Sequence, residues 1–169
     1  MKTTLAMVCA TVLSLMFTRS DGAESHPDSA QAQFERLKSL VGEWDAPLAN
    51  NQTMTDVFRP IGLGTAILHE EWKGGEQITA TVFYVVGNEL RADHFCDLGN
   101  QLHYVAKPSD DPNLVTLELR DSTNLDTHPR HFHSTTWHLV DATHHTQDWE
   151  LMGGGKDAKV VRMEFVRKK

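Results

Sequence analysis

The segment 91–104 gathers side chains that could bind or react with a small molecule. Because successive side chains of a strand point to opposite faces, His94 and Cys96 are expected to share one face. If residues 97–100 form the loop of a hairpin, His94 and His103 become cross-strand neighbours. Two imidazoles and a thiol on an otherwise apolar face are typical of a binding pocket.

Further polar and apolar side chains are expected around this pocket. Asn100 and Gln101 should lie near its rim. The apolar side chains expected beside the two histidines are Val82, Tyr84, Leu90 and Ala92.

Two interpretations of this first cluster stay open. The side chains could hydrogen-bond a small, partly apolar ligand, or both histidines could be core residues whose polar atoms are satisfied within the protein. The ligand types would also suit zinc or copper. A fourth ligand with metal-type spacing is missing, so no metal site is predicted.

A second cluster of candidate residues includes the segment His131-Phe132-His133. If Asp141-Ala142 forms a two-residue turn, His133 should lie opposite Glu150. Such a pair at a barrel mouth could be a general base with its orienting acid. The same pair is also a common cross-strand contact on a solvated face.

The remaining histidines add little to a site. His144 and His145 are adjacent, so at most one of them can face a pocket. His69 is expected on the surface or at a rim. The chain contains no HExxH, Gly-x-Ser-x-Gly, phosphate-loop or nucleotide-binding fingerprint. No catalytic residue and no particular cofactor can therefore be assigned.

The first 23 residues have the pattern of a secretory signal peptide. Lys2 is followed by the uncharged run 5–17, which is shorter than the ~20 apolar residues that span a bilayer. We expect a secreted or periplasmic protein with a flexible lead-in over 24–33. Removing the leader leaves Cys96 as the only cysteine, so no internal disulfide is expected.

Charge and hydropathy restrict the partners. The formal net charge of −7 disfavours binding to a phosphate backbone, so nucleic acid is not expected as a partner. No second apolar run approaches membrane length. Stable membrane insertion is therefore not expected once the leader is removed.

Residues 34–169 are expected to form one all-β domain. An amphipathic helix is predicted from Phe34 to Val41, ending at Gly42. Period-two segments separated by Gly, Asn, Asp and Pro predict an antiparallel up-and-down β-barrel of about 8–10 strands. The expected strands are 43–47, 53–60, 64–73, 76–87, 89–96, 101–107, 113–120, 130–140, 144–152 and 158–167.

The motif Gly42-Glu43-Trp44 after a short helix resembles the first strand of calycin barrels, such as lipocalins and fatty-acid-binding proteins. The resemblance implies that Trp44 closes one barrel end against an arginine of the last strand, Arg162 or Arg167.

The chain also resembles the DUF1579-like family of small exported proteins of unknown function. That resemblance implies a calycin-like barrel and no established activity. It rests on the segments 37–44, 94–96, 99–101, 131–133, 141–144 with Trp149, and 165–167.

These observations favour a protein that binds a small, partly apolar ligand inside the barrel. One alternative is an enzyme that uses a His–carboxylate or His–Cys pair in the same cavity. The other is a haem or metal carrier. The residues predicted to contact the ligand are His94, Cys96, Asn100, Gln101, His103, His133 and Glu150.

Overall fold

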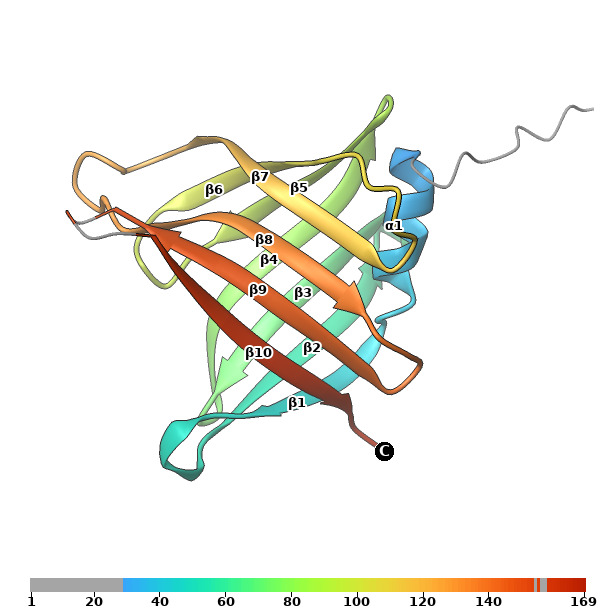
Figure 1. The fold of residues 1–169 in the computed structure, drawn as a ribbon, viewed down its shortest axis with the longest axis horizontal. Helices are drawn as coiled ribbons and strands as arrows, with labels where there is room; N and C mark the ends of the chain where they lie inside the picture. Colours follow the sequence, from blue (N-terminus) through green and yellow to red (C-terminus); the bar gives the residue numbers. More distant parts are fainter. Residues whose placement is uncertain (1–28, 154, 156–157) are drawn as a thin grey trace, which may run out of the picture.

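The computed structural model of the protein describes residues 29–153, 155 and 158–169 (Figure 1). The predicted signal peptide and residues 24–28 of the predicted lead-in lie outside this range. Within the described residues, no helix has the length and apolar character needed to cross a membrane.

Ten antiparallel strands close into a barrel in which each strand pairs with its neighbours in sequence, and β1 pairs with β10 (Figure 1). The prediction of an all-β, up-and-down barrel preceded by one short helix is confirmed. The strands are β1 (Gly42–Pro47), β2 (Thr53–Ile61), β3 (Ala66–Lys73), β4 (Glu76–Val86), β5 (Glu89–Phe95), β6 (Gln101–Ala106), β7 (Leu114–Ser122), β8 (His131–Leu139), β9 (His144–Met152) and β10 (Lys159–Arg167).

Helix α1 (Ala30–Lys38) lies against one end of the barrel (Figure 1). It begins four residues before the expected start at Phe34, inside the predicted lead-in. Ser29 explains this difference, because its hydroxyl accepts a hydrogen bond from the Ala32 N–H and caps the helix. The apolar face buries Phe34 and Leu37, so the helix covers this end of the core.

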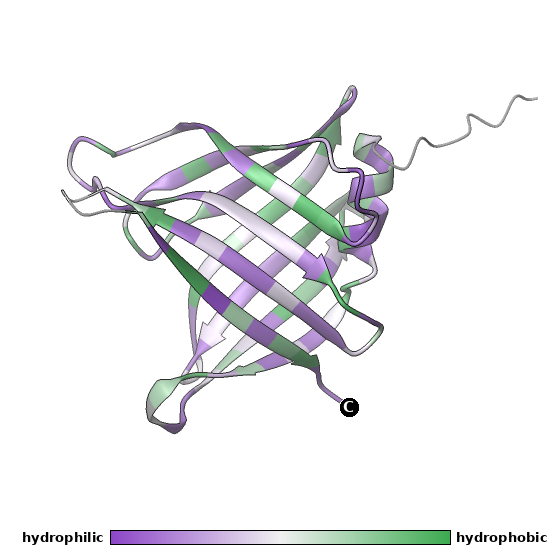
Figure 2. Cartoon of the chain, viewed as in Figure 1, coloured by the Kyte–Doolittle hydropathy of each residue, from purple (hydrophilic) through white to green (hydrophobic). Residues whose placement is uncertain are grey.

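Hydropathy changes in bands along the strands (Figure 2), as expected when successive side chains face the barrel interior and the solvent in turn. The largest fully buried side chains include Trp44, Phe58, Phe83, Tyr104 and Trp137. These rings fill the end and the middle of the barrel nearest to α1. The interior is therefore mostly a packed core.

Trp44 closes the α1 end of the barrel together with Arg167 of the last strand. The Arg167 guanidinium lies 4.0 Å from the centroid of the indole ring. It also donates hydrogen bonds to the carbonyl oxygens of Val41, Ser39 and Ala142. The expectation from calycin barrels is confirmed with Arg167, whereas Arg162 pairs with Asp148 on the outer face.

Gly42 is required where this arginine crosses the start of β1. Its φ is +134°, and an added Cβ would lie 2.7 Å from Arg167 Nη1. We expect Gly42→Ala to lower the free energy of unfolding by about 1–3 kcal/mol, because it adds backbone strain and displaces the guanidinium. Urea unfolding would measure the loss. Gly74→Ala is the matched control for strain alone, since Gly74 also has a positive φ and nothing within 4 Å of its Cβ position.

Candidate functional site

His94 points into the barrel from the end of β5 and is 1% exposed. Its Nδ1 hydrogen-bonds to Thr81 Oγ1 at 2.8 Å, and its ring lies 5.2 Å from that of Trp149. Nε2 is buried and makes no hydrogen bond with any described residue. Burial, with a smaller contribution from the charge of His69, lowers the pKa of His94 to about 3. The ring is therefore neutral at physiological pH, and Nε2 is free to accept or donate one hydrogen bond.

A cavity of about 140 Å³ lies in front of His94, at the barrel end opposite α1. Glu71, Thr79, His94 and Asp97 supply its polar lining. The apolar walls come from Met54, Ile78, Phe132, Trp149, Val161 and Met163. A mostly apolar cavity with a few convergent polar groups is the usual form of a small-molecule site.

Three further interior side chains form a compact acidic and basic group, which we call the inner cluster: Asp56, His69 and Glu71. Strand pairing places Asp56 opposite Glu71 and Phe58 opposite His69, so all three point inward. His69 Nε2 lies 2.9 Å from Asp56 Oδ2, and both residues are fully buried. Burial would lower the pKa of His69, but the negative charges of Asp56, Glu71 and Glu70 together raise it.

Glu71 belongs to both the inner cluster and the cavity wall. Burial and the neighbouring Asp56 carboxylate raise the pKa of Glu71 to about 7. Its carboxylate accepts a short hydrogen bond from Thr79 Oγ1. A carboxyl group that titrates near neutrality beside a cavity could exchange a proton with a bound molecule.

Strand β9 supports the inner cluster from across the barrel. Gln147 Nε2 donates to Asp56 Oδ2 at 2.6 Å, and Trp149 Nε1 donates to Gln147 Oε1 at 2.9 Å. His145 also lies inside, stacked against Phe165 with ring centroids 4.8 Å apart. His144 is exposed, so only one of the two adjacent histidines faces the interior, as expected.

His103 does not join His94, and the prediction that they are cross-strand neighbours is wrong. The structure pairs His103 with Asp93 and His94 with Leu102. The loop holds three residues, 97–99, and is closed by a hydrogen bond from the Cys96 N–H to the Asn100 carbonyl. This shift of one residue turns His103 to the outer face.

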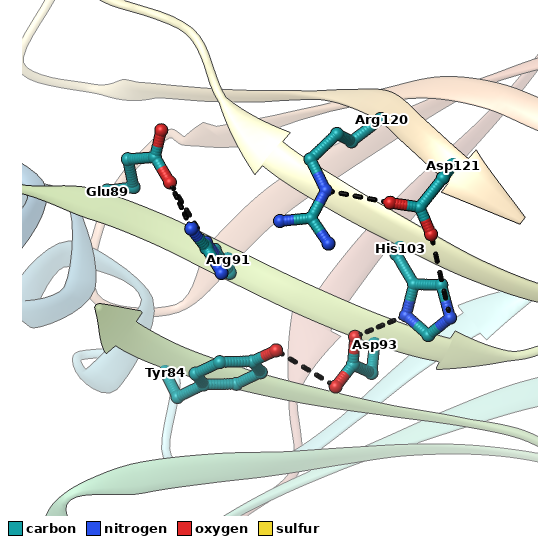
Figure 3. Close-up of polar contacts among 7 residues, drawn as sticks. All are labelled: Tyr84, Glu89, Arg91, Asp93, His103, Arg120 and Asp121. Carbon is teal, nitrogen blue, oxygen red and sulfur yellow. Dashed lines mark hydrogen bonds and ion pairs between the residues drawn. The ribbon is translucent and has the colours of Figure 1, made fainter. Parts of the chain in front are cut away.

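His103 lies instead in a polar network on the outer face (Figure 3). Its Nδ1 lies 2.6 Å from Asp93 Oδ1, and its Nε2 lies 3.9 Å from Asp121 Oδ1. Tyr84 donates to the second oxygen of Asp93 at 3.0 Å (Figure 3). Tyr84 and Val82, both expected inside, therefore face outward, and Thr81 and Phe83 take the interior positions.

Cys96, Asn100 and Gln101 lie around the same hairpin loop and outside the cavity lining. Cys96 is half-buried, with Sγ 3.6 Å from Asp97 Oδ1, and burial raises the pKa of its thiol to about 12. A thiol that stays protonated is a poor nucleophile. Asn100 is buried and donates to the carbonyls of His128 and Arg130, which ties this loop to the segment before β8. Gln101 accepts a hydrogen bond from Thr123.

His133 does not face Glu150 either. Ser134 occupies that position, and its hydroxyl donates to Glu150 Oε2 at 2.9 Å. A β-bulge accommodates His133 between Phe132 and Ser134. The connection is longer than the predicted two-residue turn, because the Val140 N–H bonds to the His144 carbonyl.

A second, wider hollow of about 580 Å³ lies on the outer face around Trp72 and Thr55. None of its lining residues is buried. The cavity in front of His94 is lined in part by buried residues, and the buried Nε2 of His94 has no partner among the described residues, so we regard this cavity as the candidate site.

The comparisons with known proteins support the architecture. No family model and no curated protein sequence matches the chain. The fold is similar to the crystal structure of Rv2717c from M. tuberculosis, with a TM-score of 0.56 and 14% sequence identity over 81% of this chain and 98% of that chain. At this identity the likeness concerns the fold alone.

Proposed function

We propose that this barrel binds a small, partly apolar molecule in the cavity at the barrel end opposite α1. The observation that carries the proposal is the His94 Nε2 atom. It is buried, belongs to a residue that lines the cavity, and has no hydrogen-bond partner among the described residues. An unpaired buried polar atom costs about 1–3 kcal/mol, and a ligand that bonds to it removes this cost.

The cavity restricts the ligand in size and chemistry. A closed apolar cavity of about 150 Å³ holds a molecule the size of benzene. The 140 Å³ here, walled by Trp149 and Phe132 beside His94, fits a single ring or a short branched chain that carries one hydroxyl, carbonyl or amine group. Phenol is the simplest probe with this combination of ring and hydrogen-bonding group.

We expect phenol to bind the protein and to bind His94→Leu at least tenfold more weakly. The leucine keeps an apolar side chain at the cavity but removes the one unpaired buried nitrogen among the described residues that line it. A lost hydrogen bond of about 1.4 kcal/mol corresponds to a factor of ten. Isothermal titration calorimetry would measure the two dissociation constants. In parallel, native mass spectrometry of the protein purified from its own host would detect a natural ligand.

His103→Leu is the matched control, because it makes the same chemical change on the outer face. Its affinity for phenol should equal that of the unmodified protein. Equal affinities for all three proteins would place phenol outside this cavity and refute the role of His94.

We further propose that the protein is exported and related to the DUF1579-like family. The run 5–17 between Lys2 and Arg19 supports a signal peptide. The segments 37–44 and 131–133 support the family. Sequencing the N-terminus of the protein from its native host would test export, because a cleaved leader removes residues up to about position 23.

A further inference from the structure

The inner cluster contains several buried polar atoms that lack a hydrogen-bond partner among the described residues. Asp56 Oδ1 and both ring nitrogens of His69 are buried and make no hydrogen bond with described residues. His69 Nε2 lies 2.9 Å from Asp56 Oδ2, an ion-pair distance, and this contact still leaves His69 Nδ1 and Asp56 Oδ1 without a partner among the described residues. Buried polar atoms are normally paired, so this group indicates a binding partner.

One potential ligand atom from each of the three side chains lies within 4.8 Å of the other two. One imidazole nitrogen and two carboxylate oxygens form a common ligand set for divalent transition-metal ions. Ligands about 2.1 Å from one ion lie roughly 3.4 Å apart at tetrahedral angles and roughly 3 Å apart at right angles. The 2.9 Å between His69 Nε2 and Asp56 Oδ2 is close to the shorter of these separations.

The carboxylates are also held as metal ligands usually are. Gln147 donates to Asp56 Oδ2, whose second lone pair can still point to an ion, and Thr79 donates to one oxygen of Glu71. Such outer hydrogen bonds orient the coordinating atoms. The His69 ring is fixed by stacking on Phe58, with centroids 4.3 Å apart, and by an edge contact with Trp137.

We propose that Asp56, His69 and Glu71 bind a divalent transition-metal ion of the Zn²⁺ type. The ion would balance the two buried carboxylates, and three protein ligands would leave at least one coordination position open. Glu71 lines the cavity as well, so the cavity provides a path to the site. This site uses none of the atoms of His94 on which the proposed function depends.

The test is a titration of the metal-free protein with Zn²⁺ at pH 8, where the ligands are deprotonated. We expect one equivalent to bind, and Asp56→Asn and Glu71→Gln each to weaken binding at least tenfold, because each change removes a charged ligand at almost unchanged size. Co²⁺ should give a visible absorption band that both variants lose. Asp93→Asn is the control, since it alters a His–Asp pair on the outer face and should bind Zn²⁺ like the unmodified protein.

A second measurement uses only the unmodified protein, so it tests the proposal even if the variants fail to fold. In the unmodified protein, Co²⁺ should shift the NMR signal of the Trp137 indole, whose ring lies 5.1 Å from that of His69. No binding, equal binding by both cluster variants, or an unshifted Trp137 signal would each overturn the proposal. Equal binding would place the ion on partly exposed histidines such as His131 and His133, whose rings lie 5.9 Å apart. The metal titrations contain no organic ligand, so their outcomes do not depend on the result of the phenol experiment.

Discussion

Trp137→Ala should lower the free energy of unfolding by about 3–5 kcal/mol, the usual range for deleting a buried large aromatic side chain. Trp137 is fully buried in the middle of the barrel. Its ring lies within 7 Å of five other ring centroids, those of Phe58, His69, Phe83, His145 and Trp149. These rings come from β2, β3, β4 and β9, so the substitution removes a contact between opposite sides of the barrel.

Urea unfolding of the two proteins would measure the difference. Leu63→Ala is the control, because Leu63 lies at the exposed tip between β2 and β3 and should change stability by less than about 0.5 kcal/mol. Trp137→Phe should have an intermediate effect, since it keeps one ring. A loss below about 1 kcal/mol for Trp137→Ala would mean that the middle of the barrel is not packed as described.

The strands were predictable because one face of nearly every strand is apolar and each break carries turn residues. All ten strands lie within a few residues of their expected positions. The pairing of each strand with the next follows from short connections such as Gly74-Gly75, which allow only an antiparallel hairpin. The capping of α1 by Ser29 was missed because the sequence before Phe34 is polar and offers no periodicity.

The register was not predictable, because it depends on the length of each loop to within one residue. Gly99 has φ +91° and completes a three-residue loop, whereas the expected four-residue loop also included Asn100. In the β8–β9 connection, Asp141 accepts hydrogen bonds from the backbone and hydroxyl of Thr143, which stabilises a longer loop than expected. Each change of one residue turns every side chain of the following strand to the other face, and this separates His94 from His103.

The inner cluster was missed for a different reason. Around His69, both faces of the strand alternate apolar and charged residues, as in Ile67 and Glu71 on one side and Leu68 and Glu70 on the other. Burial of a histidine beside two carboxylates is uncommon. The alternation therefore gave no reason to predict that the face with His69 and Glu71 points into the barrel. The useful signal was Asp56 between Met54 and Phe58, because an acidic residue flanked on its own face by large apolar residues must point into the core.

Between about pH 6.5 and 4, the free energy of unfolding should fall more steeply with decreasing pH for the unmodified protein than for the His145→Gln variant. Burial first, and then the positive charges of His69 and Arg167, lower the pKa of His145 to about 3. Above pH 6.5 the residue is neutral in both the folded and the unfolded chain. As the pH falls below 6.5, the unfolded chain binds a proton at this position and the folded protein does not, so stability decreases until the pH approaches 3.

Each such histidine contributes a slope of about 1 kcal/mol per pH unit. His94 adds a second contribution of the same sign, because its pKa is also lowered to about 3. Glu71 acts in the opposite direction, since its raised pKa lets the folded protein bind a proton first between about pH 7 and 4.5. The net slope of the unmodified protein is therefore smaller than that of the two histidines together, and only a difference between variants isolates His145.

The measurement is the free energy of unfolding in urea at pH 7, 6, 5 and 4 for three proteins. His145→Gln should lose about 1 kcal/mol less per pH unit than the unmodified protein below pH 6. His144→Gln is the matched control, because the same change is made one residue away on an exposed side chain. Between pH 7 and 5 its curve should run parallel to that of the unmodified protein. At lower pH the lost hydrogen bond to Asp141, which helps to lower the pKa of Asp141 to about 2, also contributes. If the curve of His145→Gln were also parallel, His145 would titrate alike in the folded and unfolded chains. That result would contradict its burial between Trp44 and Phe165.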